Sequence, residues 1–137
     1  MKIVLDTNVL VSAILSPGGP PGDILNLIIN DEIILCYDDR IFNEYEGVLK
    51  RDKFQFEPDN VSDLLTFLKR IGEPTDTIPL NVTITDPDDL MFYEVLGTSA
   101  ADYLITGNKR HFDPLKDRRI VTPKEFLHVY FRNFVTK

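Results

Sequence analysis

Short, uninterrupted apolar runs alternate along the chain with longer segments in which apolar residues recur every three or four positions. The short runs predict buried strands at residues 2–5, 33–36, 103–106 and 119–121. The longer segments predict helices at about residues 7–15, 23–30, 39–51, 58–72 and 86–99, and a final helix from Pro123. Residues 78–84 have an extended pattern that permits one more strand. This alternation predicts a three-layer α/β/α domain with a parallel sheet.

Breaker and capping residues divide these elements. Residues 16–22 are rich in proline and glycine and separate the first two helices. Asp38 or Asp39 is suited to cap the third helix. No repeat or linker interrupts the pattern, so we expect residues 1–137 to form a single domain.

Composition narrows the class of protein. An apolar content of 43% and a charged content of 27% are those of a globular chain. No apolar run is long enough to span a membrane or to resemble a signal peptide, so we expect a cytoplasmic location and no membrane partner. Cys36 is the only cysteine, which excludes an internal disulfide and a thiolate metal cluster. We expect it to be a small buried residue of a strand.

Several acidic residues and one asparagine lie near the predicted strands, at positions where their side chains could come together in the fold. Asp6 directly follows the first strand, and Asn108 follows the third clear strand. In a parallel sheet the functional crevice lies at the C-terminal ends of the strands, so these two residues would be neighbours if their strands are adjacent. Glu44 and Asp89 lie on helices that can reach the same crevice. We therefore expect an acidic site anchored on Asp6.

Each acid also has a structural interpretation. Asp6 would serve as a helix cap, and Glu44 by position alone is as well explained as a solvated charge. The acids at residues 86–89 begin a helix, where capping and the helix dipole account for them; we favour Asp89 as a ligand and Asp86 as the cap. Asp102 precedes its strand and lies at the opposite edge, roughly 13–16 Å from the crevice, so we interpret it as structural.

Carboxylates that are forced together repel one another and need a cation. Ligands that are all oxygen atoms suit Mg²⁺ or Mn²⁺, which commonly sit on phosphate substrates. Such ions activate water and stabilise the leaving oxygen of a phosphodiester. The net charge of −7 argues against a general nucleic-acid binder but not against an enzyme, because metal ions and a local basic patch can hold phosphates.

The ordered set of these motifs resembles the PIN domain family, which includes many small ribonucleases and the VapC-like toxins of toxin–antitoxin systems. The resemblance covers nearly the whole chain, and the matching stretches are residues 3–10, Glu44, residues 86–89 and residues 101–107. It implies the strand order 3-2-1-4-5, a divalent metal in an acidic pocket and single-stranded RNA as substrate. It carries catalytic and metal-ligand roles onto Asp6, Glu44 and Asp89. It also implies self-association, commonly as a homodimer.

The chain departs from the family pattern at one position. Family members tend to have an Asp two residues after the Thr that ends the third clear strand, and here that residue is Asn108. An amide keeps a carbonyl ligand but loses a charge, so a second metal site should be weakened more than the first. Asp113 offers a partial compensation.

Several polar residues around the crevice are supporting candidates. Asn8 and Thr106 are suited to hold the carboxylates or the attacking water, or simply to close the turns after the strands. Lys109 and Arg110 follow the crevice directly and are candidates for binding flanking RNA phosphates, the alternative being a solvated basic surface. His111 is suited to donate to a phosphate. Aromatic residues of the final helix should partly pack on the sheet and partly form a dimer contact; they are Phe126, Tyr130, Phe131 and Phe134.

Two hypotheses of different classes follow. The first is a metal-dependent endoribonuclease, in its toxin form neutralised by an antitoxin protein. The second, favoured by Asn108, is a catalytically weakened PIN domain that acts as an RNA-binding or protein-interaction module. A phosphorylatable receiver domain fits less well, because the acid pair after the first strand is missing and Pro123 precedes Lys124 rather than following it. A haloacid-type phosphatase would need a second Asp where Asn8 stands.

Overall fold

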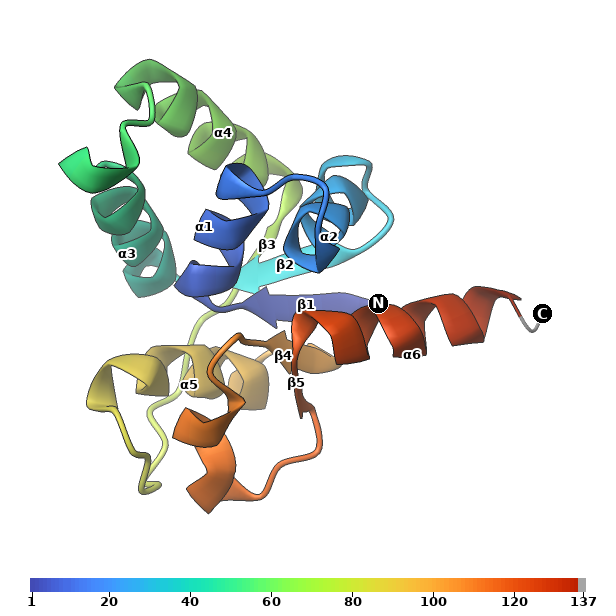
Figure 1. Cartoon of the computed structure of the whole chain (residues 1–137). Coiled ribbons are helices and arrows are strands. Elements are labelled where there is room, and N and C mark those ends of the chain that lie inside the picture. The colour runs from blue at the N-terminus through green and yellow to red at the C-terminus, as the bar shows by residue number, and fades with distance from the viewer. Residues whose placement is uncertain (136–137) are drawn as a thin grey trace.

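A five-stranded parallel sheet forms the centre of the molecule (Figure 1). The computed structural model describes residues 1–135, with side chains up to residue 133. The strands are β1 (Lys2–Leu5), β2 (Ile34–Tyr37), β3 (Glu73–Pro74), β4 (Tyr103–Ile105) and β5 (Ile120–Val121). Their order is β3-β2-β1-β4-β5, and every neighbouring pair is parallel. The predicted α/β fold and its strand order are therefore confirmed.

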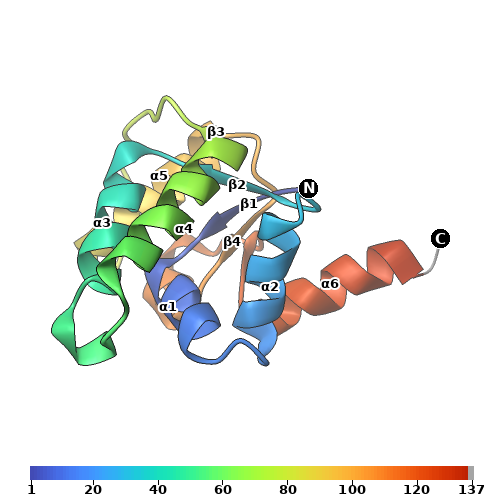
Figure 2. The ribbon, with the colours of Figure 1, turned by 90° about the horizontal axis from the view of Figure 1, so that it is seen from above.

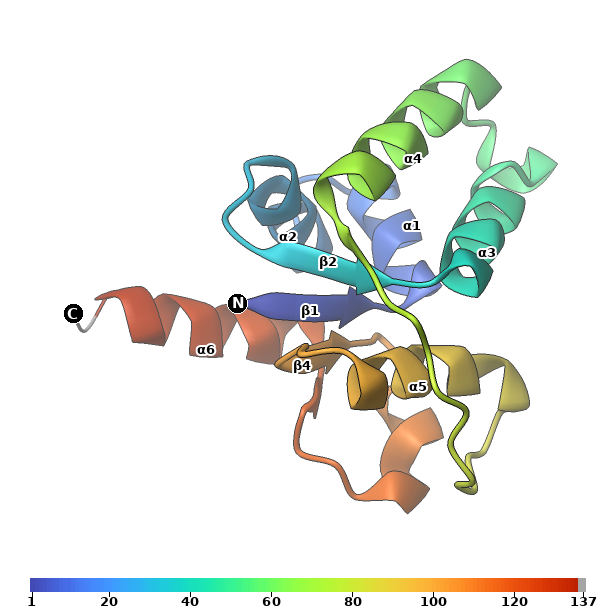
Figure 3. The ribbon, with the colours of Figure 1, turned by 180° about the vertical axis from the view of Figure 1, so that it is seen from behind.

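Helices cover both faces of this sheet. They are α1 (Thr7–Leu15), α2 (Pro20–Ile29), α3 (Asp39–Leu49), α4 (Pro58–Ile71), α5 (Leu90–Thr98) and α6 (Pro123–Val135). Short 3₁₀ helices are η1 (Asp52–Phe54), η2 (Pro87–Asp89) and η3 (Lys109–Leu115). The helices α1, α2 and α6 lie on one face, and α5 packs on the other against β1, β2 and β4 (Figures 2 and 3). Within residues 1–135, no helix has the length and apolarity needed to cross a membrane.

Burial on both faces explains why the strands stand out in the sequence as continuous apolar runs. Ile3, Val4 and Leu5 are at most 1% exposed, because helices cover the sheet on both sides. Cys36 is buried in β2, as the sequence predicts. In the pairing of β1 with β4, Leu5 lies beside Ile105. The residues that follow these two strands therefore leave the sheet at the same edge.

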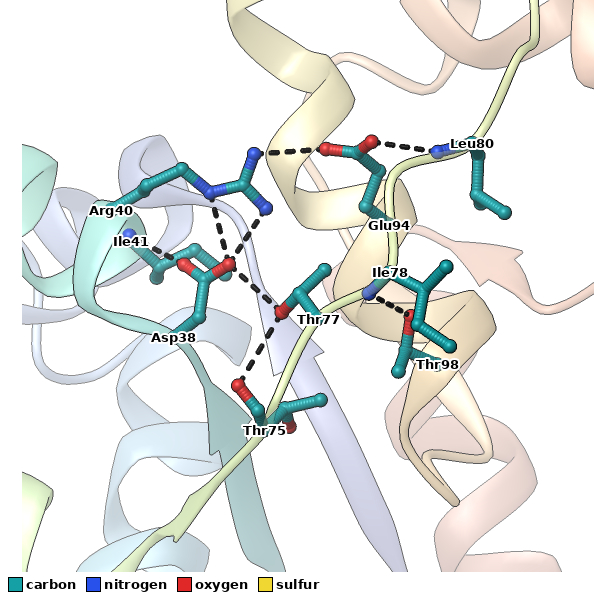
Figure 4. A network of polar contacts seen from close by, with 9 residues as sticks. All are labelled: Asp38, Arg40, Ile41, Thr75, Thr77, Ile78, Leu80, Glu94 and Thr98. Atoms are coloured by element: carbon teal, nitrogen blue, oxygen red, sulfur yellow. Dashed lines mark hydrogen bonds and ion pairs between the residues drawn. The ribbon is translucent and has the colours of Figure 1, made fainter.

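The extended segment 78–84 is not a strand, which corrects the sequence-based expectation. The third strand is instead Glu73–Pro74, directly after α4. The following chain crosses to α5, where the Ile78 amide donates to the Thr98 hydroxyl at 3.1 Å and the Leu80 amide donates to Glu94 at 2.8 Å (Figure 4). These amides are satisfied by side chains of a helix and are not available for a sheet ladder.

Two further boundaries differ from the prediction. Helix α2 begins at Pro20 rather than at residue 23, because a proline is well accommodated in the first turn of a helix, where its missing N–H costs no bond. Residues 109–115 form η3, where the sequence predicts no element. This short helix matters for the site, since it carries His111 toward the crevice.

Candidate active site

The ends of β1 and β4 hold a buried aspartate. Asp6 is 4% exposed, and Thr106, which is fully buried, donates its hydroxyl to Asp6 Oδ2 at 2.7 Å. The same hydroxyl accepts the Asn108 backbone N–H at 3.0 Å. The Asp6 N–H donates to the Ile105 carbonyl at 3.0 Å. The backbone of Asp6 is thus held by β4, and the Thr106 hydroxyl orients its carboxylate.

Glu44 reaches this edge because α3 is anchored to the end of β1. The neighbouring Tyr45 is fully buried and donates its hydroxyl to the Leu5 carbonyl. At the start of α3, Asp38 accepts the Ile41 N–H at 3.2 Å, which makes it the cap of this helix. The Glu44 carboxylate accepts the Thr7 hydroxyl, one residue after Asp6.

The third acidic segment lies at the start of α5. Asp86 accepts the Asp88 N–H at 3.0 Å and caps η2, as the sequence predicts. Asp89 ends this turn and is half-buried. Its Oδ2 lies 2.9 Å from Nδ1 of His111, which is carried by η3.

These segments surround one small cavity of about 180 Å³. Its lining includes the carboxylates Asp6, Glu44, Asp86, Asp88 and Asp89, the amides Asn8 and Asn108, and the basic side chains Arg51 and His111. We call this cavity the acidic pocket. It brings together the three acids that the sequence analysis selects, although they are separated by many residues in the chain.

Burial and mutual repulsion destabilise the charged forms of these acids. Burial raises the pKa of Asp6, against the hydrogen bond from Thr106, and the charge of Asp89 raises it further. Burial likewise raises the pKa of Glu44, opposed by the hydrogen bond from Thr7, and the charge of Asp6 adds to the rise. Each carboxylate therefore holds its proton more tightly than in water, unless a cation is bound.

Asp89 behaves in the same way. Burial raises its pKa, the hydrogen bond from His111 lowers it, and the charges of Asp86 and Glu44 raise it again. Within the described residues, ligand atoms of Asp86, Asp89 and His111 all lie within 4.8 Å of one another. Two carboxylates with an imidazole form a donor set that Mn²⁺ accepts, and the oxygen donors alone suit Mg²⁺. The residues present fit a divalent metal.

Of the other predicted site residues, some lie at the acidic pocket and some lie outside it. Asn8 and Asn108 line the acidic pocket, and Thr106 lies against Asp6. Lys109 is exposed and pairs with Glu125 of α6 at 3.1 Å, and it does not line the pocket. Arg110 is exposed and also lies outside the lining.

Two expectations about single residues are tested by the structure, and one lining residue was not expected. Asp113 lines a different cavity, so it does not replace the carboxylate that Asn108 lacks. Asp102 accepts the Lys2 N–H at 3.0 Å, at the start of β1, which is the opposite end from Asp6. The sequence analysis assigned no site role to Arg51. Its spacing of seven residues from Glu44, two helical turns, was the available signal.

Comparison with known proteins identifies the family. The profile of the PIN domain matches residues 2–110. The uncharacterized protein MJ1680 of Methanocaldococcus jannaschii is 30% identical over 150 aligned positions, which cover 99% of this chain and 95% of that protein. The family match spans Asp6 at the end of β1, Glu44 on α3 and Asp89 at the start of α5, together with the residues that follow β4. The chain belongs to the PIN domain family.

Proposed function

We propose that this protein is a metal-dependent endoribonuclease that hydrolyses phosphodiester bonds of single-stranded RNA. Membership of the PIN domain family points to a metal-dependent nuclease. The observation that carries the proposal is the acidic pocket, where one buried and two half-buried carboxylates with raised pKa values gather without an equal number of cationic partners. Such an arrangement is costly for a merely structural site, and a bound divalent cation offsets the cost.

The side chains of the pocket have distinct proposed roles. Asp6, Glu44 and Asp89 hold the cation, which when bound supplies an activated water and stabilises charge on the phosphodiester oxygens. Thr7 and Thr106 hold the carboxylates of Glu44 and Asp6 in position through the hydrogen bonds described above. Asn8 and Asn108 offer amide groups to the same space.

A second cation position is proposed beside the first. Asp86, Asp89 and His111 place three ligand atoms close together, so Asp89 would be shared by both positions. This donor set favours Mn²⁺ over Mg²⁺, because imidazole suits transition metals. We expect isothermal titration calorimetry to count two Mn²⁺ ions in the wild type and one in His111→Ala, with Asp113→Asn as the control. An unchanged count in His111→Ala would remove this second position.

The nuclease proposal is tested with purified protein. Single-stranded RNA, single-stranded DNA of the same sequence and double-stranded RNA are incubated with Mn²⁺, Mg²⁺ or EDTA. We expect internal cleavage of the single-stranded RNA with either metal and none with EDTA. If several single-stranded RNAs stay intact with both metals, the proposal is wrong.

A second candidate function is an RNA-binding or protein-interaction module with weakened catalysis. It is favoured by Asn108, which lines the pocket where a carboxylate is expected. RNA binding without turnover in the wild type, together with cleavage restored in Asn108→Asp, would favour this function over the first. Cleavage by the wild type that Asn108→Asp leaves unchanged would exclude it.

Partners are also proposals. A toxin role with an antitoxin partner suits the acidic surface, because the net charge of −7 would attract a basic segment of the antitoxin. A homodimer would use α6, where Phe126 and Tyr130 are buried but Phe131 is 49% exposed; the Phe134 side chain lies outside the described residues. Light scattering of the wild type and Phe131→Glu tests the dimer, which is disproved if both are monomers.

A further inference from the structure

A stripe of side chains on α3 continues past the end of the helix into the acidic pocket. Glu44, Val48 and Arg51 all line the pocket, and they are spaced four and three residues apart. Residues at these spacings lie on one face of a helix. The Arg51 N–H donates to the Val48 carbonyl at 3.1 Å, so the backbone continues in a helical turn after α3 ends at Leu49. The Arg51 side chain is thereby placed at the rim of the pocket beside Glu44.

The guanidinium of Arg51 is not used by the fold. Among residues 1–133, no carboxylate forms a hydrogen bond or an ion pair with it, and its charge lowers the pKa of Glu44. Arg40, at the other end of α3, contrasts with it. Arg40 is held by Asp38 at 2.7 Å and by Glu94 at 2.9 Å. Arg51 is thus free to bind an incoming anion.

An anionic substrate needs such a group at this place. The lining of the acidic pocket contains five carboxylates, which repel a polyanion in the absence of metal. The basic side chains of the lining are Arg51 and His111, and the ring of His111 already faces Asp89. Arg51 is therefore the permanently charged donor of this lining. A guanidinium matches two oxygens of a phosphate with a planar pair of N–H donors.

We propose that Arg51 binds the RNA phosphate adjacent to the one that is cleaved, and so sets where the strand lies across the acidic pocket. This inference rests on the proposed function and deepens it. It moves the main phosphate contact from Lys109, which is paired with Glu125 and lies outside the lining of the pocket, to Arg51, which is part of that lining. Arg51 acts on substrate position, and the metal ligands are separate from it.

The test measures RNA binding under conditions without turnover. A short fluorescein-labelled single-stranded RNA is titrated with wild type, Arg51→Ala and Arg51→Lys in the presence of Ca²⁺, by fluorescence anisotropy over a series of KCl concentrations. The matched control is Lys50→Ala, because Lys50 is the neighbouring cation and pairs with Glu46 at 3.2 Å. Thermal unfolding and Mn²⁺ titration of each variant are the accompanying measurements.

We expect Arg51→Ala to weaken RNA binding about tenfold, and to reduce the slope of log affinity against log salt by about 0.7, the value for each phosphate neutralised on a single strand. Arg51→Lys should keep the slope and recover only part of the affinity, since an ammonium lacks the planar pair of donors. Lys50→Ala should match the wild type. Thermal unfolding should be unchanged in all variants, and all should still bind Mn²⁺, with slightly tighter binding in Arg51→Ala because a cation beside Glu44 is removed. In cleavage assays Arg51→Ala should raise KM more than it lowers kcat.

The outcomes separate this inference from the function on which it rests. If the wild type binds RNA and Arg51→Ala has the same affinity and salt slope, the inference is overturned and the nuclease proposal stands. If Lys50→Ala loses as much affinity as Arg51→Ala, the interaction is general electrostatic attraction and the inference is likewise overturned. A wild type that binds no single-stranded RNA would overturn the proposed function, and the assignment of Arg51 with it.

Discussion

Two acidic clusters lie beside α3, and they differ in how many hydrogen-bond donors and cations face their carboxylates. Around Arg40, the carboxylates of Asp38 and Glu94 are satisfied by a guanidinium, by backbone amides and by the Thr77 hydroxyl (Figure 4). Around Asp6, carboxylates from three segments meet with few donors between them. The first cluster is complete within the chain, and we propose that a bound cation completes the second.

The pKa shifts express this difference. Burial acts to raise the pKa of Asp38, but hydrogen bonds from Arg40, the Ile41 amide and Thr77 outweigh it, so the pKa is lowered. For Asp6 burial is also the largest cause, and there the single hydroxyl of Thr106 and two backbone amides do not outweigh it. Similar carboxylates are thus stabilised as anions in one cluster and destabilised in the other. A structural acid has a cationic partner within the fold, whereas an acid that binds a metal has no such partner in the metal-free protein.

The largest expected effect comes from the acidic pocket. Asp6→Asn should reduce the rate of RNA cleavage by about two to three orders of magnitude, because a ligand of the cation is lost. The same change should raise the unfolding temperature of the metal-free protein, since it removes a buried charge that is repelled by Asp89. Cleavage assays and thermal unfolding measure the two effects. A metal-free variant less stable than the wild type would show that Asp6 is a structural acid like Asp38.

The pH dependence of metal-free stability should have opposite signs for the two clusters. Asp6 and Glu44 have pKa values raised above their ordinary 3.8 and 4.5, so the folded state binds protons more tightly than the unfolded state. Their contribution to stability therefore falls as pH rises from about these values through the raised ones. Asp38 has a lowered pKa, so its contribution is present above 3.8 and is lost as pH falls toward the lowered value.

A divalent cation should cancel the first of these dependences. Mn²⁺ at a hundred times its dissociation constant should stabilise the protein by about 2.7 kcal/mol at pH 7, and by less at pH 5, where protons compete for the carboxylates. Differential scanning calorimetry with and without Mn²⁺ makes the comparison. Asp6→Asn is the control and should be stabilised less by metal than the wild type, because only the position on Asp86, Asp89 and His111 keeps all its ligands. Equal stabilisation at both pH values would contradict the raised pKa values of the pocket.

Breaking the complete cluster should affect folding and not metal binding. Arg40→Ala leaves the buried Glu94 without its charged partner, and we expect a loss of about 2 kcal/mol in the free energy of unfolding. Arg110→Ala, at an exposed arginine, is the matched control and should change stability little. Urea unfolding gives the stabilities, and calorimetry gives the Mn²⁺ affinity. A loss of Mn²⁺ affinity in Arg40→Ala would mean that the two clusters are coupled.

The smallest effect compares one hydroxyl in each cluster. Thr106→Val removes the donor to Asp6, and we expect cleavage to fall about tenfold with metal binding weakened, as for other groups that orient a ligand. Thr77→Val removes the donor to Asp38 and should lower stability by about 1 kcal/mol without changing cleavage. Rate measurements and urea unfolding are made on both variants. Similar effects of the two changes on cleavage would erase the distinction between the clusters.

The sequence by itself determined four of the five strands and the edge of the sheet at which the acids meet. Strands β1 and β4 are short apolar runs buried on both faces, and a pattern of that kind depends on local sequence alone. The rule that parallel strands end at a common edge then placed Asp6 near Asn108. The segment 78–84 was misassigned because its apolar residues were judged without their partners. Its amides bind Glu94 and the Thr98 hydroxyl, which no local pattern shows.

Only the tertiary structure decided which side chains complete each cluster. Thr7 meets Glu44, His111 meets Asp89 and Arg40 meets Glu94 across gaps of 37, 22 and 54 residues. These contacts depend on how helices pack on the two faces of the sheet, and that packing is set by the whole core. The sequence shows which residues carry a charge. Whether that charge is neutralised, as for Arg40, or left to bind a ligand, as we propose for Arg51, depends on neighbours that only the folded chain supplies.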